Sequence, residues 1–230
     1  MKGEKIQMVS ASIYRISIGE EKNGRCEELT RILDPLGWGP VKQWEAASPA
    51  DLRGSFIQYL NSYSRALTYA HTQIWRRMLE DNLDFVLVLE DNIRLSVDMV
   101  LRLSEFMSTL PSMDPLWDAV FLNVSESTTP SYAWVRATDQ CMSGAYVLSR
   151  RGAGFLCDTF PTTDTLYMAD WMTQVLQRRQ HSFTFFPWLA IMDLGMPTTF
   201  PRFTVENEML IMEKVKRLLK EVGVSFEAYL

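Results

Sequence analysis

The sequence has little of what marks a membrane protein, a zinc protein or a phosphate-loop enzyme. Its 230 residues include two histidines and three cysteines, and Cys26, Cys141 and Cys157 lie far apart without metal-ligand spacing. No stretch approaches the length of a membrane span, the N-terminus lacks the apolar segment of a signal peptide, and no glycine-rich phosphate loop occurs. We therefore expect a cytoplasmic protein whose reduced thiols are buried as small hydrophobic groups, and not a phosphotransferase.

An excess of basic charge is also missing. The formal net charge is −5, which weighs against a large nucleic-acid footprint but leaves a local basic groove open. The hydrophobic fraction of 47% and the charged fraction of 22% are ordinary for a globular protein. Aromatic residues reach 12%, with seven tryptophans, enough for a substantial core and for stacking surfaces. The length predicts one domain over residues 1–230.

Apolar periodicity predicts strands that alternate with helices. We expect strands near residues 7–17, 41–44, 84–89, 117–122, 132–138, 141–148 and 182–186. We expect helices near residues 25–36, 64–80, 96–110, 150–157 and 166–179, a helix start at 48–51, and an amphipathic C-terminal helix at 206–222 within 205–230. Residues 125–131 and 192–204 read as loops. This alternation is typical of an α/β sandwich with a largely parallel central sheet and helices on both faces.

The chain is organised around the stretch Asp84-Phe-Val-Leu-Val-Leu-Glu90-Asp91-Asn92. A short apolar run of this kind is typical of a strand buried on both faces. It ends in two carboxylates and an amide, at the sheet edge where open α/β sheets bind ligands. Crowded carboxylates usually serve a cation or a proton. The alternative is a polar strand end in which Asp91 or Asn92 caps the next helix.

Four segments, weak signals one by one, follow one another in a specific order. They are Ile13-Tyr-Arg-Ile-Ser17 with Gly24-Arg25-Cys-Glu-Glu-Leu29; Leu67-Thr-Tyr-Ala-His71-Thr-Gln-Ile-Trp75; Leu89-Glu90-Asp91-Asn92; and Ser143-Gly-Ala-Tyr146-Val-Leu-Ser149-Arg150-Arg-Gly-Ala153. Their order and spacing over about residues 13–170 resemble glycosyltransferase family 25, the enzymes of lipooligosaccharide synthesis and collagen galactosylation.

The resemblance implies a GT-A-type, Rossmann-like fold that binds a nucleotide sugar, with a UDP-sugar as the favoured donor, and inverting transfer to a hydroxyl. It also implies a divalent metal, Mn²⁺ or Mg²⁺, held by Asp91 with Glu90 or Asn92 and completed by Asp193. The chain departs from the family at Asn92, where an Asp is expected. An Asn carbonyl can coordinate a hard cation but adds no charge, which puts metal use in question.

Inversion requires a separate carboxylate as general base. The family places an Asp at the start of the helix after the Ser-Arg segment, and Asp164 and Asp170 both match it. Asp164 also makes a good helix N-cap. Asp170 falls inside the expected helix, where Asp has no propensity advantage, and its spacing from the Ser-Arg segment fits the family better. Asp170 is therefore the preferred base.

We expect the nucleotide sugar to be contacted by Ser17, Arg25, His71, Glu90 and Gly144. A positive charge such as that of Arg25 is unfavourable at a helix N-terminus because of the helix dipole. Arg25 either binds a phosphate or carboxylate there or is solvated. His71 can bind ligand or pack in the core. Gly144 within a strand predicts a close backbone approach. The same residue patterns leave Trp75 and Tyr146 as core side chains.

The sequence thus predicts a metal-assisted, inverting glycosyltransferase. A bacterial surface glycan fits the family best as acceptor, with a hydroxymethylated phage DNA base or a protein side chain as alternatives. A non-catalytic sugar-nucleotide-binding or scaffolding protein of the same fold is the rival, because Asn92 permits loss of the metal. The lysine-rich side of the C-terminal helix favours a solvated face, with an oligomer contact or a peripheral membrane contact as alternatives.

Overall fold

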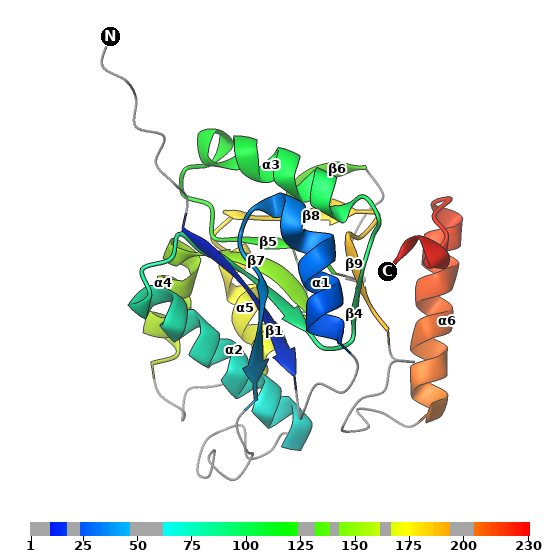
Figure 1. Ribbon diagram of the computed structural model, residues 1–230, viewed down its shortest axis with the longest axis horizontal. Helices are drawn as coiled ribbons and strands as arrows, with labels where there is room; N and C mark the ends of the chain where they lie inside the picture. Colours follow the sequence, from blue (N-terminus) through cyan, green and yellow to red (C-terminus); the bar gives the residue numbers. More distant parts are fainter. Residues whose placement is uncertain are drawn as a thin grey trace.

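A computed structural model describes residues 10–17, 24–46, 62–123, 132–138, 143–161, 167–193 and 205–230. The strands are β1 (Ala11–Ser17), β2 (Val41–Glu45), β3 (Phe85–Glu90), β4 (Ile93–Leu95), β5 (Ala119–Phe121), β6 (Ala133–Arg136), β7 (Ala145–Ser149), β8 (Ser182–Phe186) and β9 (Ala190–Met192). The α-helices are α1 (Arg25–Leu33), α2 (Ser62–Glu80), α3 (Met99–Met113), α4 (Arg150–Thr159), α5 (Ala169–Gln177) and α6 (Val205–Glu221). Two short 3₁₀ helices, η1 (Asp34–Leu36) and η5 (Phe226–Ala228), complete the described elements (Figure 1).

Seven strands form one central sheet in the order β2-β1-β3-β7-β5-β8-β6. The pairs β1–β2, β1–β3 and β5–β8 are parallel, whereas β7 is antiparallel to both of its neighbours and β6 is antiparallel to β8. Every central strand except β6 and β7 therefore runs in one direction. The prediction of an α/β fold with a largely parallel sheet is confirmed.

Strand register assigns side chains to the two faces of the sheet, because paired residues point to the same side. Tyr14 pairs with Val88, Val88 with Tyr146, and Tyr146 with Phe121. The Tyr146 hydroxyl meets His71 of α2, so α2 covers this face. Helices α4 and α5 contact α2 and belong to the same layer (Figure 1).

Helices α1 and α3 cover the opposite face. Arg15, which alternates with Tyr14 along β1, reaches Cys26 of α1. In β8, Thr184 pairs with Phe121 on the α2 side, so Phe183 points the other way. The Phe183 ring meets the α3 residue Phe106 at 5.3 Å between centroids. The sheet is thus sandwiched between two helical layers, as predicted.

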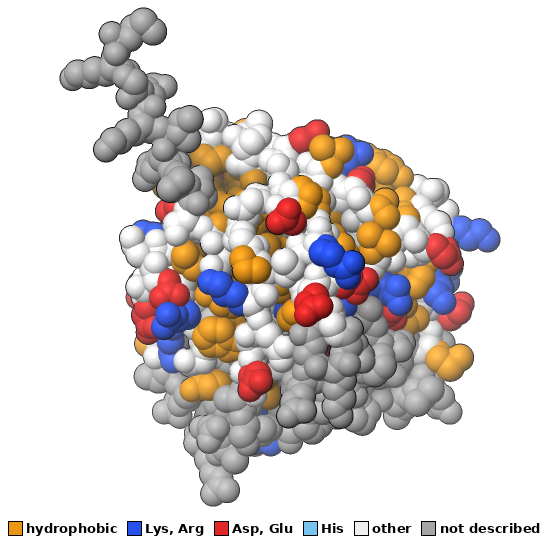
Figure 2. Space-filling model, in the orientation of Figure 1, with side chains coloured by type: hydrophobic (Ala, Val, Ile, Leu, Met, Phe, Trp, Pro, Cys, Tyr) orange, Lys and Arg blue, Asp and Glu red, His pale blue; other side chains and the backbone are white. Residues whose placement is uncertain are grey.

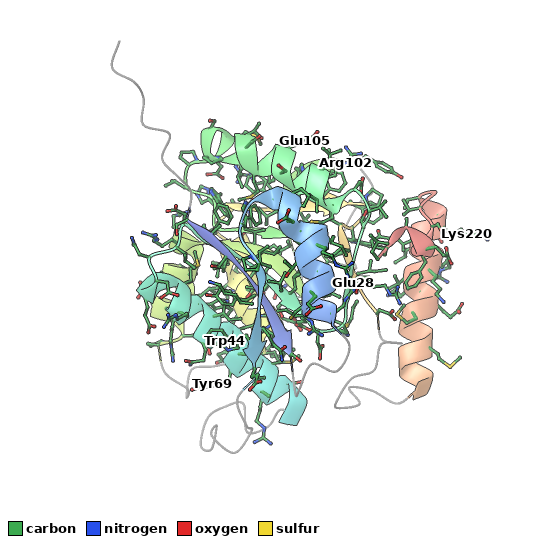
Figure 3. The ribbon with its side chains drawn as sticks, in the orientation of Figure 1. Glu28, Trp44, Tyr69, Arg102, Glu105 and Lys220 are labelled. Atoms are coloured by element: carbon green, nitrogen blue, oxygen red, sulfur yellow. The ribbon has the colours of Figure 1, made fainter. Side chains whose placement is uncertain are left out.

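The C-terminal part packs at the side of the sheet against the small two-stranded sheet β4-β9 (Figure 1). Its apolar cluster joins Val215 and Leu219 of α6 to Trp188, Ile191 and Phe186. The predicted C-terminal amphipathic helix is confirmed, and its Lys220 points outward (Figure 3). Among the described helices, none combines the length and apolar character needed to cross a bilayer.

Several element boundaries differ from the prediction. Helix α5 begins at Ala169 and not near 166, which moves Asp170 from a helix interior into the first turn. There a carboxylate is favoured by the helix dipole, so the propensity argument for Asp170 was wrong. The three-residue strands β4 and β9 were not predicted, because their pairing joins segments almost a hundred residues apart. The predicted helix start at 48–51 and the 125–131 loop lie outside the described residues.

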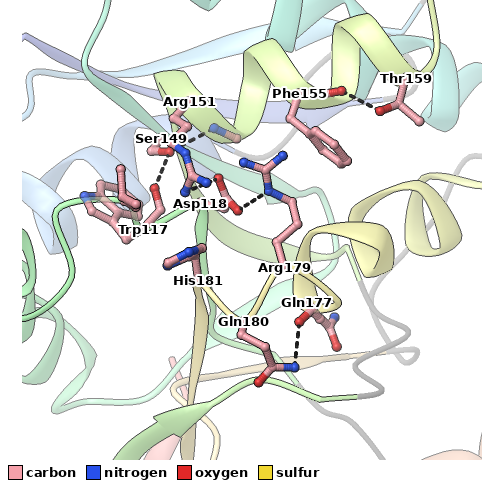
Figure 4. Close-up of polar contacts among 12 residues, drawn as sticks. Trp117, Asp118, Ser149, Arg151, Phe155, Thr159, Gln177, Arg179, Gln180 and His181 are labelled. Atoms are coloured by element: carbon pink, nitrogen blue, oxygen red, sulfur yellow. Dashed lines mark hydrogen bonds and ion pairs between the residues drawn. The ribbon is translucent and has the colours of Figure 1, made fainter.

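A group of ion pairs around Asp118, at the amino-terminal end of β5, has a structural role. Asp118 is fully buried and pairs with Arg151 at 3.1 Å and with Arg179 at 2.8 Å (Figure 4). The Asp118 carbonyl accepts the Ser149 N–H at 2.9 Å, which ties β5 to the start of α4. A Cβ at Gly152 would meet that carbonyl at 2.5 Å, so only glycine fits this approach. The cluster fixes α4 on the sheet, at the end opposite the site described next.

Candidate functional site

The candidate site lies where the strand order reverses. The chain leaves β1 toward β2 on one side and leaves β3 toward β5 on the other, so the carboxyl ends of β1 and β3 flank a topological switch point. Open α/β sheets bind ligands in the crevice at such a point. Glu90 is the last residue of β3, and its backbone N–H donates to the Gly144 carbonyl at 2.8 Å. The antiparallel strand β7 therefore delivers Ser143 and Gly144 to the same edge.

A buried hydrogen-bonded group from α2 and β7 stands behind Glu90. The Trp75 indole N–H donates to the Tyr146 hydroxyl at 2.8 Å, and that hydroxyl lies 2.9 Å from His71 Nδ1. His71 Nε2 lies 3.5 Å from Glu90 Oε1. Trp75, Tyr146 and His71 are nearly or fully buried. Each is thus fixed in place by its polar group as well as by packing.

Two carboxylates meet at Ser143. Its backbone N–H donates to Asp170 Oδ1 at 2.6 Å and its hydroxyl to the same oxygen at 2.8 Å. The hydroxyl also lies 3.4 Å from Glu90 Oε1. These contacts bring together residues of β3, α5 and the start of β7. Both of these bonds to Asp170 fall on the same oxygen, Oδ1.

Burial dominates the protonation of this group. Burial, and secondarily the Asp91 charge, raises the pKa of Glu90 to about 8. Burial, and then the Glu90 charge, raises the pKa of Asp170 to about 6, against the hydrogen bonds from Ser143. Burial lowers the pKa of His71 to about 4. At neutral pH His71 is therefore neutral, Glu90 is largely protonated and Asp170 is largely ionised.

The number of protons that each group can donate fixes the direction of these hydrogen bonds. The Trp75 N–H only donates, so the Tyr146 hydroxyl accepts it and gives its own proton to His71 Nδ1. Neutral His71 then carries its proton on Nε2, toward Glu90. The single Ser143 proton goes to Asp170, so a protonated Glu90 can donate to the Ser143 oxygen. The Asp170 carboxylate is the final acceptor of the bonds at Ser143, whereas the 3.5 Å approach of His71 Nε2 to Glu90 is not a hydrogen bond.

Asp91 and Asn92 continue the strand end toward the α1 side. Burial raises the pKa of Asp91, while the Arg15 charge opposes that rise. Asn92 is 2% exposed, and neither its amide nitrogen nor its amide oxygen has a hydrogen-bond partner among the described residues. A buried amide without partners is costly, so this side chain is suited to a bound ligand. Asp91 and Asn92 are oxygen donors of the kind hard cations prefer.

Asp193 approaches the same place through its backbone. Its N–H donates to the Asn92 carbonyl at 2.8 Å, while its carboxylate pairs with Arg94. The predicted metal ligands Asp91, Asn92 and Asp193 are therefore neighbours, with Asp193 held by an arginine. Within the described ranges, no set of three or more His, Cys, Asp or Glu side chains is arranged to hold a metal ion. The metal assignment stays a prediction.

The remaining predicted contacts surround this edge. Ser17 is 6% exposed at the end of β1. Arg25 pairs with Glu28 at 2.6 Å and donates to the Ile93 carbonyl at 3.0 Å, so it has found a carboxylate partner within its own helix. A Cβ at Gly144 would meet Ile93 Cδ1 at 2.8 Å, so the close neighbour of Gly144 is the side chain of a β4 residue, and the predicted nucleotide-sugar contact stays a prediction.

Sequence reasoning missed part of the group. Trp75 and Tyr146 are core residues, as predicted, but they also orient His71. Ser143 was read only as part of a small-residue segment, and its spacing from Asp170 gave no sign of their contact. Asp164, the alternative base, lies outside the described residues. Of the thiols, Cys26 and Cys157 are half-buried, whereas full burial was expected, Cys26 accepts from Arg15, and Cys141 lies outside those residues.

No protein-family model and no curated protein matches this chain. Among solved structures it is similar to the crystal structure of a glycosyltransferase involved in the glycosylation of the major capsid of PBCV-1. The two share 12% identity with a TM-score of 0.42, and the match covers 89% of this chain and 100% of that one. At these values the similarity carries no argument about activity.

Proposed function

We propose that this protein is an inverting glycosyltransferase of the GT-A type, which moves a sugar from a nucleotide diphosphate donor to an acceptor hydroxyl. The supporting observation is the Asp170 carboxylate at the switch-point edge. It is oriented through one oxygen by Ser143, and its pKa is raised to about 6, chiefly by burial. A base poised near the working pH is what deprotonation of a hydroxyl requires. The order of motifs that resembles glycosyltransferase family 25 ends at this residue.

Asp170 acts as the general base. Its Oδ2 accepts the acceptor hydroxyl proton as the acceptor oxygen attacks the anomeric carbon from the face opposite the leaving group. The bond from that carbon to the diphosphate breaks, and its electron pair leaves with the diphosphate. One attack at the anomeric carbon inverts its configuration, and one carboxylate is enough for the proton.

Glu90 and His71 hold the base in its working state. A protonated Glu90 adds no second negative charge beside Asp170, and through Ser143 it completes the row of donors that stabilises the Asp170 carboxylate. Neutral His71, fixed by Tyr146, packs its Nε2 at 3.5 Å from Glu90 Oε1 without a hydrogen bond and adds no charge beside Glu90. Both residues act through Asp170, so we assign them positioning roles. The sequence predicted that His71 and Glu90 contact the nucleotide sugar. The proposal assigns them the positioning role instead.

Asp91 and Asn92 face the leaving group. Their oxygens fit a hard cation by donor type, and the unpartnered Asn92 amide gives a further reason for a ligand there. When bound, Mn²⁺ or Mg²⁺ would neutralise the charge that develops on the diphosphate. Arg15, close enough to Asp91 to oppose the rise of its pKa, supplies a positive charge from the chain itself. A UDP-sugar remains the proposed donor, with Ser17 and Arg25 on the nucleotide side.

The acceptor is proposed to be a glycan. The formal net charge of −5 weighs against a DNA acceptor, and acidic and basic side chains are interspersed over the described part of the face seen in Figure 2. A hydroxymethylated DNA base or a protein side chain would still use the same base chemistry. The rival function is that of a non-catalytic sugar-nucleotide-binding or scaffolding protein. Such a protein needs no buried carboxylate with a raised pKa at this edge of the sheet, and Asp170 is such a carboxylate.

Nucleotide diphosphate release from a panel of nucleotide sugars tests the proposal, with and without Mn²⁺. The wild type should release product from one donor class. Asp91→Ala should abolish release, and Asp158→Ala, an exposed carboxylate on α4, should not. Absence of release by the wild type, with a donor-induced thermal shift retained, would establish the scaffold instead. Activity of Asp91→Ala near the parent level would remove Asp91 from the site.

A further inference from the structure

An aromatic groove lies on α5 on a different side from the carboxylates. It encloses about 310 Å³ and is lined by Phe160, Tyr167, Trp171, Gln174, Val175 and Arg178. Trp171 is 57% exposed and Tyr167 is 43% exposed, among the largest apolar side chains left open on the described surface. Large exposed aromatics grouped in one concavity are typical of a binding surface.

The groove is built by helical spacing. Trp171, Gln174, Val175 and Arg178 recur at intervals of three and four residues and so share one face of α5. Tyr167, just before the helix, continues that stripe, and its ring meets Phe160 edge-on with 6.2 Å between centroids. Phe160 is 8% exposed and forms the floor from the end of α4. The platform is therefore backed by packed residues of two elements.

The groove adjoins the proposed base. Trp171 directly follows Asp170 in the first turn of α5, where the Trp171 N–H donates to the Met168 carbonyl at 3.0 Å. Consecutive helical residues diverge by about 100° around the axis. Asp170 thus points inward to Ser143 while Trp171, the next residue, points to the surface.

The lining chemistry selects a sugar. The C–H face of a pyranose packs flat on an aromatic ring, and its hydroxyls need donors and acceptors at the edge. The Gln174 amide offers both kinds of group and the exposed Arg178 guanidinium offers donors. A nucleic-acid strand would need several cations along the groove, and Arg178 is the single cation among the lining residues that the structure describes.

We propose that this groove is a saccharide-binding part of the acceptor site, in which Trp171 and Tyr167 stack a sugar ring of the acceptor glycan. The inference rests on the proposed function, because it names the substrate class of the same site. It commits to a saccharide. An apolar peptide or an oligonucleotide as occupant is an outcome that the test can reveal.

An array of immobilised oligosaccharides, neutral and acidic, probes the groove directly. The wild type should bind a subset of glycans, and Trp171→Ala should weaken that binding at least tenfold, with partial retention in Trp171→Phe. Leu101→Ala, which removes an apolar side chain 60% exposed on α3, is the matched control and should bind normally. Circular dichroism confirms that each variant is folded.

The second readout is nucleotide diphosphate release without acceptor, measured for the wild type and for the control Leu101→Ala, which should leave that release unchanged. Glycan binding that depends on Trp171, without donor turnover by the wild type, would sink the proposed function and keep the subsite. No glycan binding by the wild type, or equal binding by Trp171→Ala, overturns the subsite. Trp171-dependent capture of an apolar peptide or a single-stranded oligonucleotide in place of a glycan overturns it too.

Discussion

Ser143 donates two hydrogen bonds to a single oxygen of Asp170, from its backbone N–H at 2.6 Å and from its hydroxyl at 2.8 Å. The backbone donor belongs to the segment that leads into β7, and the acceptor belongs to the first turn of α5. The contact therefore joins the sheet edge to the helix and sets the direction of the carboxylate. Charge-assisted bonds of this length are among the stronger ones in proteins, so the orientation of Asp170 is well fixed.

Ser143→Ala should lower kcat and shift the pH–rate profile. The variant keeps the backbone bond but loses the hydroxyl, whose bond lowers the pKa of Asp170. The pKa of Asp170 should therefore rise by about one unit, and the acidic limb of the profile should move to higher pH by the same amount. Ser143→Thr should restore both. Ser104→Ala, an exposed serine of α3, serves as control, and an unmoved acidic limb in Ser143→Ala would contradict the positioning role.

Glu90→Gln should change the pH dependence of stability. Burial raises the pKa of Glu90 from 4.5 to about 8, so the folded state holds this proton more tightly than the unfolded state does. The contribution is present below pH 4.5 and is lost as the pH rises through about 8. Fully developed, the loss is on the order of 5 kcal/mol. His71 acts in the opposite sense, since its lowered pKa removes stability as the pH falls from 6.5 to about 4, equally in both proteins.

Urea denaturation at pH 5 and pH 8 measures this difference. The wild type should lose more stability between the two pH values than Glu90→Gln does. Glu105→Gln, on the outer side of α3 in Figure 3, should behave as the wild type. Equal losses in wild type and Glu90→Gln would show that Glu90 does not carry the tightly held proton.

Gly152→Ala and Gly154→Ala should have opposite effects within one helix. A Cβ at Gly152 would meet the Asp118 backbone carbonyl at 2.5 Å, whereas a Cβ at Gly154 has nothing within 4 Å. Gly152→Ala should therefore cost about 1–3 kcal/mol through displacement of α4. Gly154→Ala should gain up to about 1 kcal/mol from helix propensity. Thermal unfolding compares the two, and similar melting temperatures would contradict the close approach of α4 to β5.

The sequence predicted what local pattern can encode. The apolar run before Glu90 gave β3, and the amphipathic spacing of α2 gave the helix that carries His71. The order of the strands, the reversed β7 and the short pair β4-β9 depend on distant pairings that no local period reveals. The contact between Ser143 and Asp170 is of the same kind, which explains why Ser143 was missed while Asp170 was predicted.

The kinetics of Asp170→Asn test the central claim most directly. We expect kcat to fall about 10²–10⁴-fold, because the amide cannot accept the proton, while the donor dissociation constant stays unchanged. The wild-type kcat/KM should rise with pH through about 6, and that rise should vanish in the variant. Asp158→Asn, exposed on α4, should match the wild type. Turnover of Asp170→Asn within about twofold of the wild type would show that another group is the base, with Asp164 the next candidate.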